Sequence, residues 1–145
     1  INMNTVAAVK PSLESLMTPS KTVDIDYPGY KDFILKLTFL GRDELMKLRK
    51  KSTSTKFDRK TRQPMEEVDD DLFLQLYVEA VIKGWSGFKY EYLADFMLVE
   101  LEDVDTNAEL DYSTENAYLL MKNSPDFDSF VADVVGDLQN FTKTK

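Results

Sequence analysis

Apolar and polar residues alternate in two neighbouring stretches near the N-terminus. In the first, Val23, Ile25 and Tyr27 are separated by aspartates, and in the second an apolar side chain recurs at every second position of residues 33–39. Successive side chains of a strand point to opposite faces, so each stretch predicts a strand with one buried face. Pro28-Gly29 between them is typical of a turn. We therefore predict an N-terminal β-hairpin.

Later stretches carry apolar residues at the spacing of three and four that one helix face requires. Residues 42–51 have acidic residues in the first turn and basic residues in the last, an order that suits the helix dipole. A second helix is expected from Val68 to Lys83, with Gly84 in the position just past its end. A third is expected to begin at Ser113 as its N-cap and to end near residue 123.

The last predicted helix has the clearest start signal. Ser124 is expected as the N-cap, followed by Pro125 at the first helical position and an aspartate. Its apolar stripe continues to Phe141, which predicts one long helix. The simplest role of this stripe is in the core, and docking of another helix is the alternative.

Three segments lack a clear period. Residues 1–22 are interpreted as an extended or flexible arm, residues 52–65 as a polar, basic loop, and residues 88–104 fit either a strand or a helix. The expected architecture is a single α+β domain over residues 23–145, in which the N-terminal β-hairpin packs on about four helices.

The composition removes most enzyme chemistry, because the 145 residues include no histidine and no cysteine. Cysteine nucleophiles, Ser–His–Asp triads and histidine or thiolate metal sites are excluded. A carboxylate hydrolase would need two facing acids, and no pair has a spacing that marks it. We predict no catalytic, cofactor-binding or metal-binding residue. Nor does the sequence show a signal peptide or an apolar run long enough to span a membrane.

Charge is distributed unevenly along a chain whose net charge is −8. Residues 42–62 hold nine basic and three acidic residues, whereas residues 66–137 hold nineteen acidic and three basic ones. Solvated surface is the simplest interpretation of the basic segment, and a contact with a partner protein is the second. Nucleic acid is the third and is disfavoured by the net charge. The candidate partner-binding residues are Arg42, Lys47, Arg49, Lys50, Lys51, Lys56, Arg59, Lys60 and Arg62.

Two acidic clusters have structural interpretations. Asp69, Asp70 and Asp71 are consecutive, and helical neighbours point about 100° apart, so a role at the helix dipole is favoured over a metal site. Residues 102–109 place oxygen-bearing side chains at alternate positions, as calcium loops do, but lack the glycine and the bidentate glutamate of such loops.

The C-terminal half carries an ordered set of short motifs. A helix precedes Gly84-Trp85-Ser86-Gly87; after a loop of about twenty residues come Leu110-Asp111-Tyr112-Ser113-Thr114-Glu115-Asn116, then Leu119-Leu120, then Ser124-Pro125-Asp126-Phe127 and a closing helix. This order resembles the tail assembly chaperones of long-tailed bacteriophages, although the loop after the tryptophan is longer here. From the residues themselves, Trp85, Gly87, Tyr112, Asn116 and Pro125 are expected to shape the domain rather than to bind a partner.

The resemblance implies a non-enzymatic chaperone in the bacterial host cytoplasm. Such a protein binds the phage tape measure protein, recruits tail tube subunits and is absent from the mature virion. A structural tail completion or connector subunit that stays in the particle is the alternative. The oligomeric state does not follow from the sequence.

Overall fold

The computed structural model describes residues 10–18 and 20–142. It has a mixed α+β fold, in which a β-hairpin and further strands pack with several helices, as predicted. The hairpin consists of β1 (Ser20–Asp26) and β2 (Ile34–Leu40), antiparallel with Val23 opposite Leu37. The turn between them includes Gly29, whose φ of 88° favours glycine. The first strand thus begins at Ser20, three residues earlier than the alternation suggested.

A third strand completes the sheet and was not predicted. Helix α4 (Asp70–Val81) ends two residues earlier than expected, and β5 (Ile82–Ser86) follows it directly and pairs antiparallel with β2. The interpretation of Gly84 as a helix-ending glycine was therefore wrong. Gly84 lies inside β5 opposite Lys36, whose side chain passes so close that a Cβ on Gly84 would lie 3.4 Å from Cδ.

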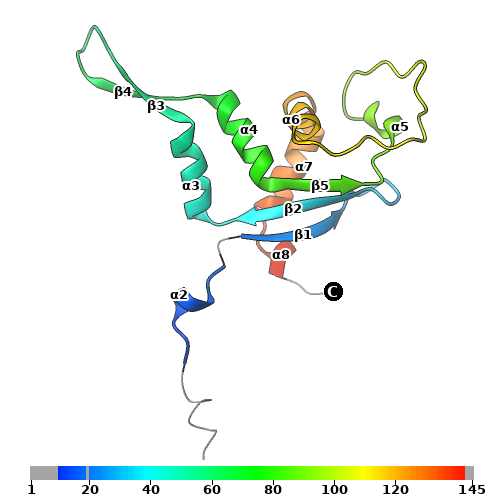
Figure 1. Ribbon diagram of the computed structural model, residues 1–145, viewed down its shortest axis with the longest axis horizontal. Helices are drawn as coiled ribbons and strands as arrows, with labels where there is room; N and C mark the ends of the chain where they lie inside the picture. The colour runs from blue at the N-terminus through cyan, green and yellow to red at the C-terminus, as the bar shows by residue number, and fades with distance from the viewer. Residues whose placement is uncertain (1–9, 19, 143–145) are drawn as a thin grey trace, which may run out of the picture.

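The helices α4, α6 (Thr114–Asn123) and α7 (Pro125–Val135) cover one face of this sheet (Figure 1). Leu35 and Leu37 of the central strand are fully buried beneath them. The opposite face is polar, with an ion pair of 3.3 Å between Asp24 and Lys36. One apolar and one polar face is the usual arrangement of an antiparallel sheet at a protein surface.

Ser124 both ends one helix and begins the next, which confirms the predicted start signal. Its amide donates to the Leu120 carbonyl at the end of α6, and its Oγ accepts a 3.2 Å hydrogen bond from the Phe127 amide in α7. Ser113 caps α6 in the same way, by accepting from the Asn116 amide. These caps satisfy N–H groups that have no partner within a helix.

The expectation of one continuous helix to Phe141 was wrong. Helix α7 ends at Val135, and a separate turn, α8 (Gln139–Thr142), follows. Asn140 Nδ2 donates to the Val134 carbonyl in the last turn of the helix, which also accepts a 3.2 Å hydrogen bond from the Asp137 amide. The break brings Phe141 against Phe39 of the sheet, with ring centroids 5.4 Å apart.

Residues 52–65 do not form an irregular loop, which corrects another prediction. Helix α3 (Arg42–Lys51) leads into β3 (Thr53–Phe57), which pairs antiparallel with β4 (Pro64–Val68). This second hairpin projects from the body at the upper left of Figure 1. Two strands that share no sheet with the core expose most of their side chains, so the polar sequence has no buried face to reveal its strands.

Two short helical turns complete the chain. Helix α2 (Leu13–Leu16) lies within the segment expected as an extended arm, and residues 1–9 of that arm lie outside the described residues. Helix α5 (Tyr90–Leu93) is a single turn in the ambiguous stretch 88–104. It is followed by a long loop, whose residues 94–111 we call the acidic loop.

An aromatic cluster forms the centre of the core. Phe33 stacks on Phe88 with ring centroids 4.3 Å apart, and Tyr27 stacks on Phe33 at 5.1 Å. Phe96 and Phe127 add edge-on contacts from the acidic loop and from α7. This cluster joins the turn of the first hairpin to the elements at the other end of the chain.

Candidate partner-binding surface

Helix α3 presents most of the predicted basic residues. Asp43 and Glu44 lie in its first turn and Arg49, Lys50 and Lys51 in its last, the arrangement expected for the helix dipole. Leu45 and Leu48 pack against the core, and no residue of this helix is fully buried. The helix is therefore a surface element with a narrow inner stripe.

A shallow groove of about 650 Å³ lies beside α3, between this helix and the segment after α2. Met17 and Met46 supply its apolar surface, with 65% and 59% of these side chains exposed. Charges of both signs line it, namely Arg42, Lys47 and Lys50 with Asp43 and Glu44, and Lys47 forms a 3.3 Å ion pair with Glu44. The sequence analysis missed the two methionines. One of them could have been found from the sequence, because Met46 is an apolar residue that lies outside the inner stripe of α3.

The second hairpin is fixed at its base. Ser52 is buried, and its Oγ donates to the carbonyls of Leu48 and Arg49 at the end of α3. Its own carbonyl accepts a 2.8 Å hydrogen bond from the amide of Asp69, the N-cap of α4. The two helices therefore hold both strands at the point where the hairpin leaves the body.

The turn of this hairpin is held by Asp58. Its Oδ1 accepts a 2.8 Å hydrogen bond from the Lys60 amide, and its carbonyl accepts one from the Arg62 amide. The Lys60 hydrogen bond is the main reason why the pKa of the Asp58 carboxyl is lowered. The turn thus presents Arg59, Lys60 and Arg62 at the tip, with all three side chains exposed.

The nine predicted basic residues fall into three sets. Arg42, Lys47 and Lys50 line the groove, and Arg49 and Lys51 lie on α3 without lining it. The remaining four belong to the second hairpin: Lys56, Arg59, Lys60 and Arg62. Lys56 forms a 2.9 Å ion pair with Glu67 on the neighbouring strand. One basic segment of sequence therefore supplies two separate surfaces.

The residues of the sequence motif lie apart from the groove and the second hairpin. Several of them meet where the end of β5 contacts the last residues of the acidic loop. We call residues 82–90 and 108–112 the β5 junction. Trp85 Nε1 donates a 2.8 Å hydrogen bond to the Leu110 carbonyl, and Tyr112 OH donates one of 2.6 Å to the Ile82 carbonyl. The two rings meet edge to face at 5.1 Å. These side chains fasten one segment to the other.

Gly87 is required by the geometry of this junction. Its φ is 71°, and a Cβ would lie 1.9 Å from the Asp32 carbonyl oxygen, closer than any real contact. Its amide donates to Glu109 Oε1 at 2.8 Å. The sequence analysis expected Gly87 to shape the domain, whereas its close approach to Asp32 was not visible in the sequence.

The other two motif residues lie at helix starts. Asn116 Nδ2 donates a 3.0 Å hydrogen bond to the Asp111 carbonyl in the preceding loop. Pro125 occupies the first position of α7. Neither residue lines the groove or belongs to the second hairpin.

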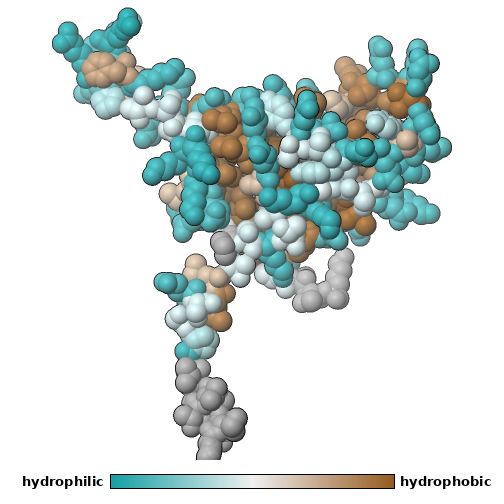
Figure 2. All heavy atoms as spheres, in the orientation of Figure 1, coloured by the Kyte–Doolittle hydropathy of each residue, from teal (hydrophilic) through white to brown (hydrophobic). Residues whose placement is uncertain are grey.

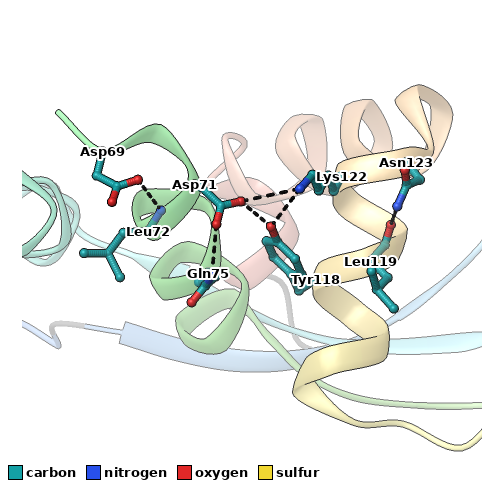
Figure 3. Close-up of polar contacts among 8 residues, drawn as sticks. All are labelled: Asp69, Asp71, Leu72, Gln75, Tyr118, Leu119, Lys122 and Asn123. Atoms are coloured by element: carbon teal, nitrogen blue, oxygen red, sulfur yellow. Dashed lines mark hydrogen bonds and ion pairs between the residues drawn. The ribbon is translucent and has the colours of Figure 1, made fainter.

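The three aspartates at the start of α4 have separate roles. Asp69 is the N-cap and accepts from the Leu72 amide at 3.0 Å, and Asp70 lies in the first turn. Figure 3 shows Asp71 pointing instead toward α6, where it accepts a hydrogen bond from Tyr118 OH. It also accepts a 3.0 Å hydrogen bond from Gln75 Nε2 of its own helix. Lys122 lies 3.8 Å away. The hydrogen bond from Tyr118 OH is the main cause that lowers the pKa of Asp71. A separate hydrogen bond from Lys122 Nζ to the Tyr118 oxygen is the main cause that raises the pKa of Lys122.

Two of the side-chain oxygens at alternate positions of residues 102–109 accept hydrogen bonds from backbone amides. Asp105 Oδ1 accepts from the Asn107 amide, and Glu109 accepts from the Gly87 amide. Over residues 10–18 and 20–142, no group of three or more acidic side chains is arranged to hold a metal ion. Within the same residues, no helix combines the length and the apolar character needed to cross a membrane.

Comparison with known proteins gives a family match. The family model described as "YdaY prophage protein" matches residues 41–145, which is more than half of the chain. The matched region begins just before α3 and includes the groove helix, the second hairpin and the β5 junction. Comparisons with curated proteins and with solved structures found no match.

Proposed function

We propose that this chain, which belongs to the YdaY prophage protein family and is thus phage-derived, is a non-enzymatic tail assembly chaperone. It acts in the bacterial host cytoplasm, binds the tape measure protein and recruits tail tube subunits while the tail is built. The order of motifs around the β5 junction, which resembles that of tail assembly chaperones, supports this role.

The observation that carries the proposal is the groove beside α3. Met17 and Met46 line it with unbranched, adaptable side chains, and its three basic residues outnumber its two acidic ones, Asp43 and Glu44. Methionine surfaces accommodate varied apolar partners, and a hydrophobic groove suits the apolar face of an amphipathic helix. The tape measure protein is long and helical by resemblance, and segments of it with acidic flanks fit this groove best.

Charge gives this binding a reversible character. The lysines and arginine of the groove are exposed, and contacts of exposed charges weaken as salt rises. Such contacts speed association more than they strengthen the final complex. A chaperone that must leave when the tail tube polymerises benefits from that balance.

The test is co-expression of this chain with the tape measure protein of the same prophage. We expect the tape measure protein to stay soluble and to co-purify with this chain. The double variant Lys47→Glu/Lys50→Glu should lose co-purification, because it reverses two charges of the groove. Wild-type recovery of the tape measure protein by this variant would contradict the groove as the binding site.

A matched control lies on the same helix. Arg49→Glu/Lys51→Glu makes the same change in charge in the last turn of α3 at two residues that do not line the groove. This variant should keep most of the co-purification. Equal losses in both variants would indicate that only the overall charge matters.

Analysis of purified virions separates the chaperone from a structural tail completion or connector subunit. A chaperone is absent from mature particles, and mass spectrometry of particles induced from the prophage should not detect this chain. Its presence in stoichiometric amount would favour the structural subunit.

A further inference from the structure

Two exposed surfaces of opposite charge lie at opposite ends of the molecule. The second hairpin projects at one end of the long axis, and the acidic loop lies at the other (Figure 1). We propose that the tip of the hairpin of one copy binds the acidic loop of a second copy, so that copies associate head to tail. This inference does not depend on the proposed function.

The hairpin tip is basic and partly apolar. Residues 56–62 hold four basic residues and one acidic one. Phe57 and Met65, on the two paired strands, are 65% and 51% exposed. An isolated two-stranded hairpin is marginally stable in water, and neither face of this one is covered by another element. A partner surface would cover the apolar side chains that the body of the molecule leaves exposed.

The acidic loop has the complementary chemistry. Residues 94–111 hold seven acidic residues and no basic one. Leu98 is completely exposed at 102%, and Val99 and Val104 are exposed at 36% and 38%. Figure 2 shows brown, hydrophobic atoms gathered over this end of the molecule among teal, hydrophilic ones. Apolar side chains surrounded by charge of one sign are typical of a protein-binding surface.

The loop is held firmly enough to serve as a docking site. Phe96 is buried in the aromatic cluster, and the Tyr90 and Glu91 amides donate to the carbonyls of Ala108 and Thr106. Tyr30 OH donates a 3.0 Å hydrogen bond to Asp95. Both ends of the loop are thus anchored, while Leu98 and its acidic neighbours remain outside.

Geometry requires the contact to be intermolecular. The hairpin and the acidic loop leave the body at opposite ends of the longest axis, so the hairpin cannot reach the loop of its own chain. A contact between two different surfaces of identical copies leaves one free hairpin and one free loop after each addition. Such an interface forms rings where the rotation closes and filaments where it does not.

Charge reversal provides the sharpest experiment. The hairpin variant is Arg59→Glu/Lys60→Glu and the loop variant is Glu100→Lys/Glu102→Lys; all four side chains are exposed, and no side-chain hydrogen bond or ion pair is found for them. Arg59→Glu/Lys60→Glu changes the net charge of residues 56–62 from +3 to −1, so this variant alone opposes two acidic surfaces and should remain a single chain. Glu100→Lys/Glu102→Lys reduces the net charge of residues 94–111 from −7 to −3, so this variant alone should associate more weakly than the wild type. In an equimolar mixture, the unchanged hairpin of the loop variant meets the unchanged loop of the hairpin variant, so the two variants should pair, whereas the hairpin variant alone does not.

Sedimentation velocity of the purified chain at increasing concentration, in low salt and at neutral pH, measures the outcome. The wild type should grow beyond two copies, and added salt should weaken the association. A wild type that stays a single chain, or a limit at two copies, would overturn the proposal. So would full association of the hairpin variant alone, or a mixture in which the two variants fail to pair. Unfolding midpoints equal to that of the wild type confirm that the variants are folded.

A matched pair of variants tests the apolar part of the contact. Leu98→Ser removes the fully exposed leucine of the acidic loop, and Leu119→Ser removes a leucine that is 41% exposed on α6. The first should weaken association and the second should not. Equal behaviour of the two variants would count against the acidic loop as the docking site.

Discussion

The β5 junction and the second hairpin are two β elements that flank the same helix, α4, yet they are held in different ways. In the junction, side chains such as Trp85 and Tyr112 donate to backbone carbonyls of a distant segment and pack on buried rings. The hairpin exposes nearly all of its side chains and depends on its turn and on Ser52 at its base. The junction therefore stabilises the domain, whereas the hairpin is available for binding.

The largest expected effect is in the junction. Gly87→Ala places a Cβ against the Asp32 carbonyl oxygen and imposes a side chain on a positive φ. We expect the free energy of unfolding to fall by at least about 3 kcal/mol, because a left-handed conformation and a steric clash add. Urea unfolding followed by circular dichroism measures the loss.

Gly29→Ala is the matched control for this prediction. Its φ of 88° is also positive, but nothing lies within 4 Å of the new Cβ. Only the conformational cost of about 1–2 kcal/mol should remain. If both variants lose the same stability, the close packing of Gly87 on Asp32 does not contribute.

The next effect concerns one hydrogen bond of the junction. Tyr112→Phe keeps the ring against Trp85 but removes the donor to the Ile82 carbonyl. The expected loss is about 1 kcal/mol, the typical net contribution of a hydrogen bond in a protein. Tyr92→Phe, whose hydroxyl is 3.5 Å from the Lys31 carbonyl, should lose much less in the same urea unfolding experiment. A larger loss of unfolding free energy in Tyr92→Phe than in Tyr112→Phe would contradict the greater contribution expected from the Tyr112 hydrogen bond.

These differences explain what the sequence could predict. The first hairpin was predictable because Val23, Ile25 and the alternate residues of β2 have one buried face. Helix starts at Ser113 and Ser124 were predictable because a cap uses residues only three positions apart. In both cases the signal is local. The motif residues of the junction also had local signals, but their partners Ile82 and Leu110 did not.

The errors arose where distant contacts decide the structure. Gly84 follows a helix and was interpreted as its end, but pairing of Ile82 and Trp85 with β2 makes this segment a strand. The second hairpin has no alternation because it has no buried face. For the groove and the acidic loop, only the charge could be predicted from the sequence. The contributions of Met17 to the groove and of Leu98 to the loop depend on the exposure of these side chains in the folded chain.

A smaller effect, dependent on pH, is expected between α4 and α6. The pKa of Asp71 is lowered from 3.8, chiefly by the Tyr118 hydrogen bond, so the cluster stabilises the fold above about pH 4 and loses this contribution as the pH falls through the lowered pKa. Tyr118→Phe should therefore be less stable than the wild type at pH 7, and the difference should shrink near pH 3. Urea unfolding at both pH values tests this, and a difference independent of pH would contradict the coupling.

The smallest effect on stability is expected at the tip of the second hairpin, where the comparison with the junction is sharpest. Arg59→Glu/Lys60→Glu changes two exposed side chains, and the Lys60 amide that donates to Asp58 remains. The unfolding midpoint should stay at the wild-type value, because substitutions of exposed side chains without partners have little effect. Association between copies should nevertheless be lost, since the same change places acidic residues opposite the acidic loop. A shifted midpoint would show that the tip contributes to the stability of the fold, and the separation between a stabilising junction and a binding hairpin would then fail.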